Sequence, residues 1–263
     1  MIRIVAVANQ KGGVGKTTTA VNVAAYLAQA GERVLLVDMD PQGNATSGLG
    51  VDQHRTTVGV YDVLLQGMAP ERAWRTTSVP NLLLLPASPS LAQAEVQLVG
   101  VSEREFALRK QLRPVAASFG LVVIDCPPSL GLLTVNALVA AEGVVVPIQC
   151  EYFALEGVAQ LLGAVQRVRE QWNPELDITG VLLTMFDGRT NLAYQVAEEV
   201  KRAFRGKVLR SVVPRNVRLS EAPSHGLPIG LYDARSKGAE IYRDVAKEVL
   251  VRARGAKAVR TRP

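Results

Sequence analysis

A glycine-rich stretch near the start of the chain has the residue types of a phosphate-binding loop. Residues 10–18 (QKGGVGKTT) follow a short apolar run and precede an alanine-rich helical pattern. Strand, glycine-rich turn and helix in this order let backbone N–H groups surround an anion at the helix N-terminus. Lys16 then supplies a positive charge to the β- and γ-phosphates of a nucleotide, and the Thr17 hydroxyl supplies a ligand for Mg²⁺. Gln10 departs from the general pattern, which has glycine there, and a second lysine, Lys11, follows it.

Two further motifs place carboxylates where a magnesium–triphosphate complex needs them. Residues 33–38 form a continuous apolar run that is typical of a buried parallel strand and ends in Asp38, with Asp40 two residues later. Residues 121–125 (LVVID) end in Asp125 as a Walker B strand does, so that the carboxylate reaches Mg²⁺ from a rigid strand. Asp40 is our candidate for positioning the attacking water, whereas Asp38 is expected to cap a turn.

The elements that must position these motifs alternate regularly along the chain. Strands are expected at residues 2–8, 33–38, 81–86, 121–125, 143–148, 178–185 and 208–214, and helices at 17–30, 102–118, 131–141, 154–172, 191–204 and 237–254. This alternation predicts a three-layer α/β fold, a mainly parallel twisted sheet with helices on both faces, and the glycine loop at residues 10–18 indicates the P-loop NTPase type. In the last helix, Val245 and Leu250 are expected to face the core, and Arg243 and Arg252 to face solvent.

The bulk composition indicates one globular domain. A chain of 263 residues with 48% hydrophobic content can bury a full core, so we expect one domain over residues 1–254 and a mobile basic tail over 255–263. No run reaches the roughly 18 apolar residues of a membrane span, and a cleaved signal peptide would destroy the glycine loop. Cys126 and Cys150 are expected to be buried thiols. We therefore expect a cytoplasmic protein without stable membrane insertion.

Charge is distributed unevenly along the chain. Residues 1–199 contain 14 Lys and Arg against 19 Asp and Glu, a net charge of −5, whereas residues 200–263 contain 16 against 5, a net charge of +11. Such asymmetry indicates contact with a polyanion, either nucleic acid or an anionic membrane surface. Charge alone does not separate these partners from a solubilising surface.

Five segments together resemble one known family. They are residues 11–18 (KGGVGKTT), 38–44 (DMDPQGN), 124–129 (IDCPPS), 149–157 (QCEYFALEG) and 214–226 (PRNVRLSEAPSHG). Their sequences resemble those of the deviant-Walker ATPases, and within them the chromosomal ParA/Soj partition proteins. The first motif is similar also to MinD, nitrogenase iron protein and arsenite ATPases, but the last two segments are more specific. The resemblance covers nearly the whole chain.

The resemblance implies a magnesium-dependent ATPase that is slow without its partner and DNA. Lys11 would reach across a nucleotide-sandwich homodimer to the partner's phosphates, much as an arginine finger does, and Gly12 would leave room for that approach. The implied nucleotide-binding residues are Lys11, Gly12, Gly13, Val14, Gly15, Lys16, Thr17 and Thr18, with Pro214 and Asn216 beside adenine. Lys11, Lys16 and Asp40 would serve hydrolysis, and Thr17, Asp40 and Asp125 the Mg²⁺ site. ATP and Mg²⁺ are thus the implied cofactors.

The same resemblance implies a DNA-bound, nucleoid-associated switch. The family binds double-stranded DNA without sequence preference as the ATP-bound dimer, and a ParB-type centromere-binding protein stimulates the hydrolysis that releases it. Arg189 and Arg218 match DNA-contacting arginines of the family, and phosphate contacts by such residues give affinity without reading bases. Lys201, Arg202 and Arg205 are expected to belong to the same basic region.

Two other classes of function use the same loop. A MinD-like membrane-surface ATPase in division-site placement would carry a C-terminal amphipathic helix with bulky apolar anchors, and after Leu250 and Val251 this chain has no Trp, Phe or Leu. A metabolic ligase or reductase would show added substrate or cluster ligands, and two separated cysteines argue against a cluster on one subunit. Chromosome partition is therefore the leading hypothesis.

Overall fold

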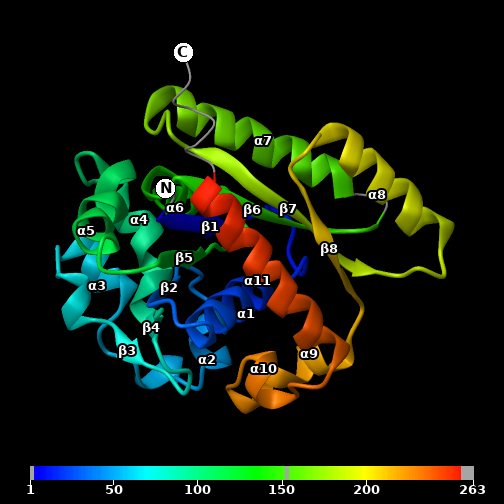
Figure 1. Ribbon diagram of the computed structural model, residues 1–263. Helices are drawn as coiled ribbons and strands as arrows, with labels where there is room; N and C mark the ends of the chain where they lie inside the picture. Colours follow the sequence, from blue (N-terminus) through cyan, green and yellow to red (C-terminus); the bar gives the residue numbers. More distant parts are fainter. Residues whose placement is uncertain (1–2, 152–153, 256–263) are drawn as a thin grey trace.

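An eight-stranded sheet forms the centre of the molecule (Figure 1). The computed structural model describes residues 3–151 and 154–255. The strand order is β3-β4-β2-β5-β1-β6-β7-β8, and all neighbours are parallel except β3 and β4. The strands are β1 (Ile4–Val7), β2 (Val34–Asp38), β3 (Arg75–Thr76), β4 (Leu82–Leu85), β5 (Leu121–Asp125), β6 (Gly143–Gln149), β7 (Asp177–Phe186) and β8 (Val208–Pro214). The predicted α/β fold with a mainly parallel sheet is confirmed.

Helices cover both faces of this sheet and bury two separate apolar clusters (Figure 1). The first cluster is covered by α3 (Val60–Leu65), α4 (Ala94–Leu98), α5 (Ala107–Ala116), α6 (Leu132–Ala140), α7 (Ala154–Gln171) and α8 (Asn191–Ala203). The second is covered by α1 (Lys16–Gln29), α2 (Asn44–Gly48), α9 (Val217–Glu221), α10 (Ile229–Tyr232) and α11 (Lys237–Gly255). No helix in the described ranges combines the length and apolar character needed to cross a membrane.

The strand order brings the three predicted motifs to one edge of the sheet. β5 lies between β1 and β2, and Asp125 at its end is in register with Val7 of β1 and Asp38 of β2. Parallel strands buried on both faces are continuous apolar runs, which is why these strands were evident in the sequence. Because the carboxyl ends of parallel strands meet at one edge, the glycine loop and both acidic segments converge there.

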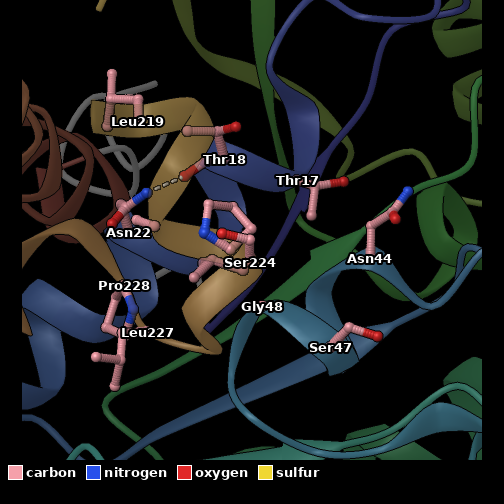
Figure 2. A pocket seen from close by; sticks show the side chains of 13 residues that line it. Thr17, Thr18, Asn22, Asn44, Ser47, Gly48, Leu219, Ser224, Leu227 and Pro228 are labelled. Atoms are coloured by element: carbon pink, nitrogen blue, oxygen red, sulfur yellow. Dashed lines mark hydrogen bonds between the residues drawn. The ribbon is translucent and has the colours of Figure 1, made fainter. Parts of the chain in front are cut away.

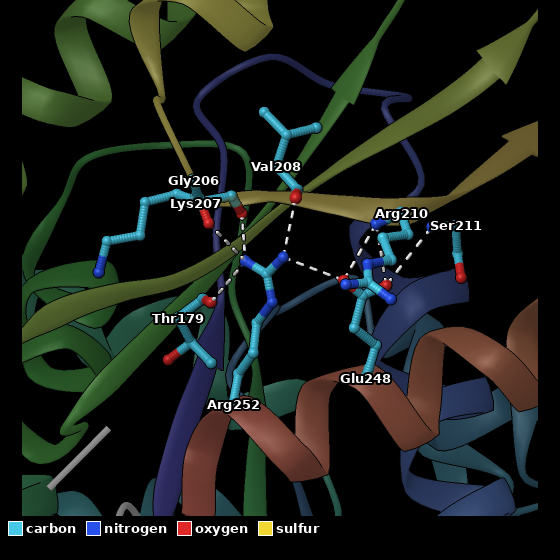
Figure 3. A network of polar contacts seen from close by, with 8 residues as sticks. All are labelled: Thr179, Gly206, Lys207, Val208, Arg210, Ser211, Glu248 and Arg252. Carbon is cyan, nitrogen blue, oxygen red and sulfur yellow. Dashed lines mark hydrogen bonds and ion pairs between the residues drawn. The ribbon is translucent and has the colours of Figure 1, made fainter. Parts of the chain in front are cut away.

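The free edge of β8 is closed by two side chains of α11, and this corrects one expectation (Figure 3). Arg252, expected to face solvent, donates to the carbonyl oxygens of Lys207 at 2.6 Å and Val208 at 2.8 Å. Glu248 accepts from the N–H of Arg210 at 2.9 Å and pairs with Arg252 at 3.0 Å. An edge strand presents unpaired backbone N–H and C=O groups. Binding these groups stabilises Arg252 and Glu248 against β8 more than exposure of Arg252 to solvent would.

The remaining predicted segments match the structure closely, apart from short 3₁₀ turns. The expected helix at 102–118 is divided into a 3₁₀ turn, Arg104–Phe106, followed by α5. Leu250, expected in the core, is only partly buried, whereas Val245 is fully buried. The predicted tail, residues 255–263, lies outside the described residues except for Gly255, which ends α11. Tyr152 and Phe153 of the fourth motif segment also lie outside the described residues.

Candidate functional site

The glycine loop joins β1 to α1 and leaves the start of α1 open to a ligand. Gly13 and Gly15 adopt left-handed φ angles of 73° and 87°, which side chains disfavour, so these two positions require glycine. Gly15 is the N-cap of α1, and no side chain caps that helix within the described residues. The first backbone N–H groups of α1 therefore remain available to an anion, as the loop motif predicts.

Lys16 is the first residue of α1 and is buried beside the acidic groups. Its Nζ donates to the carbonyl oxygen of Lys11 at 2.9 Å, across the loop. Burial lowers the pKa of Lys16, and the charge of Asp125 opposes part of that change. A buried ammonium beside several carboxylates is suited to a strongly anionic ligand, because such a ligand replaces lost hydration with direct charge pairing.

Asp125 has the surroundings of a cation ligand. Its side chain is completely buried, yet neither oxygen meets hydrogen-bond geometry with any described residue. Burial raises the pKa of Asp125 well above its usual value and the charge of Asp38 adds to the rise, while the nearby Thr17 hydroxyl opposes it. A buried carboxylate without partners is costly, and a hard cation that prefers oxygen ligands would satisfy it. Thr17 and Asp125 thus fit Mg²⁺.

The two carboxylates after β2 have different surroundings. Asp38 accepts hydrogen bonds from the N–H and the hydroxyl of Thr46, both at 2.7 Å, and from the N–H of Asp40. Burial raises the pKa of Asp38 to about 6. These contacts agree with the expectation that Asp38 caps a turn. Asp40 is also buried, but its carboxylate accepts one hydrogen bond within the described residues, from the N–H of Gln42 at 3.0 Å. Asp40 therefore retains lone pairs for a water molecule or a ligand.

Lys11 is held within the chain by an acidic residue. Its Nζ lies 3.6 Å from Oε2 of Glu151, and the two side chains are 33% and 43% exposed. Oε1 of the same carboxylate accepts from Arg215 at 2.8 Å and from the side chain of Gln149. The glycine loop, the end of β6 and the loop after β8 are therefore joined through Glu151. No role for Glu151 was evident in the sequence, although the fourth motif segment contains it.

Two adjoining cavities open beside the start of α1. The first, of about 430 Å³, is lined by α1, α2, α9 and the segment after α9, with Thr17, Asn44 and Ser47 on one side and Leu219 and Ser224 on another (Figure 2). Figure 2 also shows the bond from the Asn22 side chain to the Thr18 carbonyl oxygen. The lining is neutral, with hydroxyl and amide groups beside apolar surface.

The second cavity, of about 450 Å³, contains the residues predicted to lie beside adenine. Pro214 and Asn216 line it together with Gly15 and Thr18 of the phosphate loop. Asn216 is the N-cap of α9 and accepts from the N–H of Arg218 at 2.9 Å, so its oxygen already has a structural use. Tyr242 of α11 also lines this cavity, and no motif or spacing in the sequence indicated it. The cavity lies where a nucleoside attached to loop-bound phosphates would fit.

The predicted DNA-contacting residues fall into two places. Arg189 and Arg218 are 87% and 56% exposed and follow the carboxyl ends of β7 and β8. Arg189 pairs with Asp187 at 2.7 Å and Arg218 with Glu221 at 2.9 Å. Lys201, Arg202 and Arg205 are exposed at the far end of α8, a helix of 13 residues and hence about 20 Å long. The structure does not gather all five residues at one place.

Comparisons with known proteins agree with this geometry. A family model described as an AAA domain matches residues 2–178. The chain is 57% identical over 249 residues to the sporulation initiation inhibitor protein Soj of Bacillus subtilis, with 95% of this chain and 98% of that protein covered. It is 54% identical over 250 residues to the chromosome partitioning protein ParA of Myxococcus xanthus, with 95% and 88% covered. The crystal structure of cobyrinic acid a,c-diamide synthase from Mycobacterium smegmatis, with a bound ATP analogue and magnesium, has a TM-score of 0.85 and 41% identity, with 100% and 99% covered.

Proposed function

Because the chain belongs to the ParA/Soj family of chromosome-partitioning ATPases, we propose that it is an ATP-driven switch that partitions DNA. ATP and Mg²⁺ are its cofactors, and hydrolysis yields ADP and phosphate. The single observation that carries this proposal is the convergence of the uncapped start of α1, buried Lys16 and partnerless Asp125 at one edge of the sheet, among the described residues. A similar chain holds an ATP analogue with magnesium, which supports the same choice of ligands.

Each residue of the site has a distinct task in this proposal. Backbone N–H groups at the start of α1 orient the phosphates, and Lys16 pairs with their negative charge. Thr17 and Asp125 would hold Mg²⁺, and Asp40 would lie beside it. Bound Mg²⁺ neutralises charge that develops on the phosphate oxygens. Few protein ligands would be needed, because Mg²⁺ sites in proteins generally retain several waters. Asp40 accepts hydrogen bonds from the attacking water and so aligns it with the γ-phosphate.

The site is completed by a second copy of the chain. Lys11 lies in the loop with its side chain partly exposed, and within this chain its ammonium group pairs with the carboxylate of Glu151. Gly12 has an ordinary φ angle, and a Cβ there would meet no described atom within 4 Å, so nothing described within one chain requires glycine. Close approach of a partner subunit would explain why this position is glycine. Lys11 would then offset the charge of two opposed triphosphates.

Double-stranded DNA binds the dimer through phosphate contacts. Arg189 and Arg218 follow the carboxyl ends of the neighbouring strands β7 and β8, and dimerisation would align two copies of each into one basic face. Their present partners, Asp187 for Arg189 and both Glu221 and Asp233 for Arg218, compete with DNA phosphates for the same guanidinium groups. A ParB-type partner accelerates hydrolysis and thereby releases the dimer from DNA.

Binding to DNA and to membranes, measured side by side, tests this function. The wild-type chain is mixed with unrelated duplex DNAs and with phosphatidylglycerol liposomes, each with ATP, ADP or no nucleotide. We expect binding to every duplex with ATP only, and no liposome binding; Lys16→Ala abolishes the response. Liposome binding without DNA binding would instead establish the MinD-like function and overturn the proposal.

A further inference from the structure

Tyr242 of the C-terminal helix α11 is buried at the edge of the cavity that would hold the nucleoside. Tyr242 is 1% exposed, and it is among the residues that border the 450 Å³ cavity together with Gly15, Thr18 and Pro214. Its hydroxyl lies 3.2 Å from Oγ1 of Thr19. The two residues are 223 positions apart in the chain. A side chain from the last helix thus reaches the first turn of the helix that begins the phosphate site.

The hydrogen bonds between these residues have a fixed direction. Oγ1 of Thr19 donates to the carbonyl oxygen of Gly15 at 2.7 Å, because a carbonyl can only accept. The single proton of the Thr19 hydroxyl is therefore used, and the Tyr242 hydroxyl must donate to it. The same Gly15 carbonyl accepts from the N–H of Thr19 at 2.9 Å. The chain of donors runs from Tyr242 through Thr19 to Gly15.

The backbone conformation of Gly15 determines where the first N–H groups of α1 point. Gly15 has a left-handed φ of 87° and precedes the first N–H groups of α1, so rotation of its peptide would redirect those groups. A glycine has no side chain to fix this conformation, and its backbone freedom is the largest of any residue. Two hydrogen bonds to its carbonyl oxygen restrict that freedom.

The helix that carries Tyr242 is itself held at two places. Glu248 and Arg252 bind the edge of β8, and Val245 and Val249 are buried against α1 and the sheet. The hydroxyl of Tyr242 is thus presented at a fixed position, and forming its hydrogen bond costs little additional ordering.

We propose that Tyr242 is a positioning residue of the nucleotide site, which holds the Gly15 carbonyl through Thr19 from its buried place behind the nucleoside cavity. The proposal rests on the proposed function, since it names a further residue of the same site. Its ligand is the adenosine diphosphate portion shared by ATP and ADP. Thr19 alone could hold Gly15, as threonine often bonds to the carbonyl four residues before it. The contribution of Tyr242 is what the experiment isolates.

Calorimetric titration with Mg-ADP tests this role without requiring dimerisation. A neutral hydrogen bond contributes modestly, so we expect Tyr242→Phe to weaken ADP binding about three- to tenfold. Thr19→Val should give a similar loss, and the double variant should lose no more than the larger single loss. Thr19→Ser keeps the hydroxyl and should bind as the wild type does. Tyr26→Phe is the matched control, because the buried Tyr26 hydroxyl has no hydrogen-bond partner among the described residues.

Thermal unfolding of each variant without nucleotide separates binding from stability. A purely structural hydrogen bond would lower the unfolding temperature of Tyr242→Phe while leaving its ADP affinity equal to that of the wild type, and that result would overturn the proposal. Additive losses in the double variant would also overturn it. If the wild type itself fails to bind ADP, the proposed function fails instead, so the two failures are distinguishable.

Discussion

Replacing Glu151 by glutamine should strengthen ATP-dependent dimerisation. The variant keeps the size of the side chain and an oxygen that can accept from Arg215, but it removes the charge that holds Lys11 within its own chain. In the proposed dimer Lys11 must leave Glu151 to reach the partner's phosphates. Breaking the pair in advance therefore lowers the free-energy cost of assembly.

The size of this effect follows from the geometry. Two unit charges 3.6 Å apart attract each other in bulk water by about 1 kcal/mol, and exposed pairs deliver about half of that once screening and side-chain entropy are counted. Because a dimer contains two copies of Lys11, the expected gain is about 1 kcal/mol. This corresponds to about a fivefold lower dimer dissociation constant at low salt, with little difference at high salt.

Analytical ultracentrifugation with ATP measures the dissociation constant directly. An Asp40→Ala background prevents hydrolysis during the run, and Glu198→Gln is the matched control, since Glu198 forms an exposed pair with Lys201 at 2.8 Å away from the loop. The gain should disappear when Lys11→Ala is added, because the released lysine causes it. An unchanged or weaker dimer in Glu151→Gln would refute the reasoning.

Three further predictions concern catalysis, DNA and pH. Asp40→Ala should retain ATP binding but hydrolyse ATP at least about a hundredfold more slowly, as phosphate release will report; a normal rate would remove Asp40 from the mechanism. Arg189→Ala and Arg218→Ala should weaken DNA binding equally for all duplexes. Each should also reduce the slope of log affinity against log salt by about one unit for each DNA phosphate that the arginine neutralised. A sequence-dependent loss of affinity would contradict this, and Arg202→Ala is the comparison at the far end of α8. In the nucleotide-free protein, the raised pKa of Asp38, about 6 against an ordinary 3.8, means that the folded state holds the proton more tightly. Its stability contribution is present below pH 4 and is lost as pH rises through 6, so urea unfolding should give about 1 kcal/mol less stability at pH 7 than at pH 5 from this group. Asp38→Asn should flatten that dependence, and an equal slope in both proteins would contradict it.

The sequence was sufficient to predict the sheet and the nucleotide edge because both depend on local patterns. Parallel strands buried on both faces are continuous apolar runs, and Asp125 and Asp38 end two of them. Once the strands are placed in one parallel sheet, their carboxyl ends must share an edge. The glycine loop needs only its own residues to be recognised. These features require no knowledge of which distant side chains meet.

The contacts that the sequence did not reveal all join distant segments. Tyr242 contacts Thr19 from the other end of the chain, and Glu151 contacts Lys11 because the segments that follow the neighbouring strands β6 and β1 lie together. Arg252 has the spacing of a solvent-facing helix residue, but the free edge of β8 lies beside it. The basic residues of α8 follow Arg189 closely in sequence, yet a straight helix carries them about 20 Å away. Such outcomes depend on the packing of whole elements.

The central claim is that Lys11 of one subunit acts at the nucleotide of the other. The test mixes Lys11→Ala chains with Asp40→Ala chains, each inactive alone, and measures the rate of ATP hydrolysis in the presence of DNA and the ParB-type protein. In a mixed dimer, one site then combines an intact Asp40 with Lys11 supplied by the other subunit. We predict that an equimolar mixture recovers about a quarter of the wild-type rate, since random pairing gives half mixed dimers with one working site each. If the mixture stays as inactive as its components, Lys11 does not act across the interface.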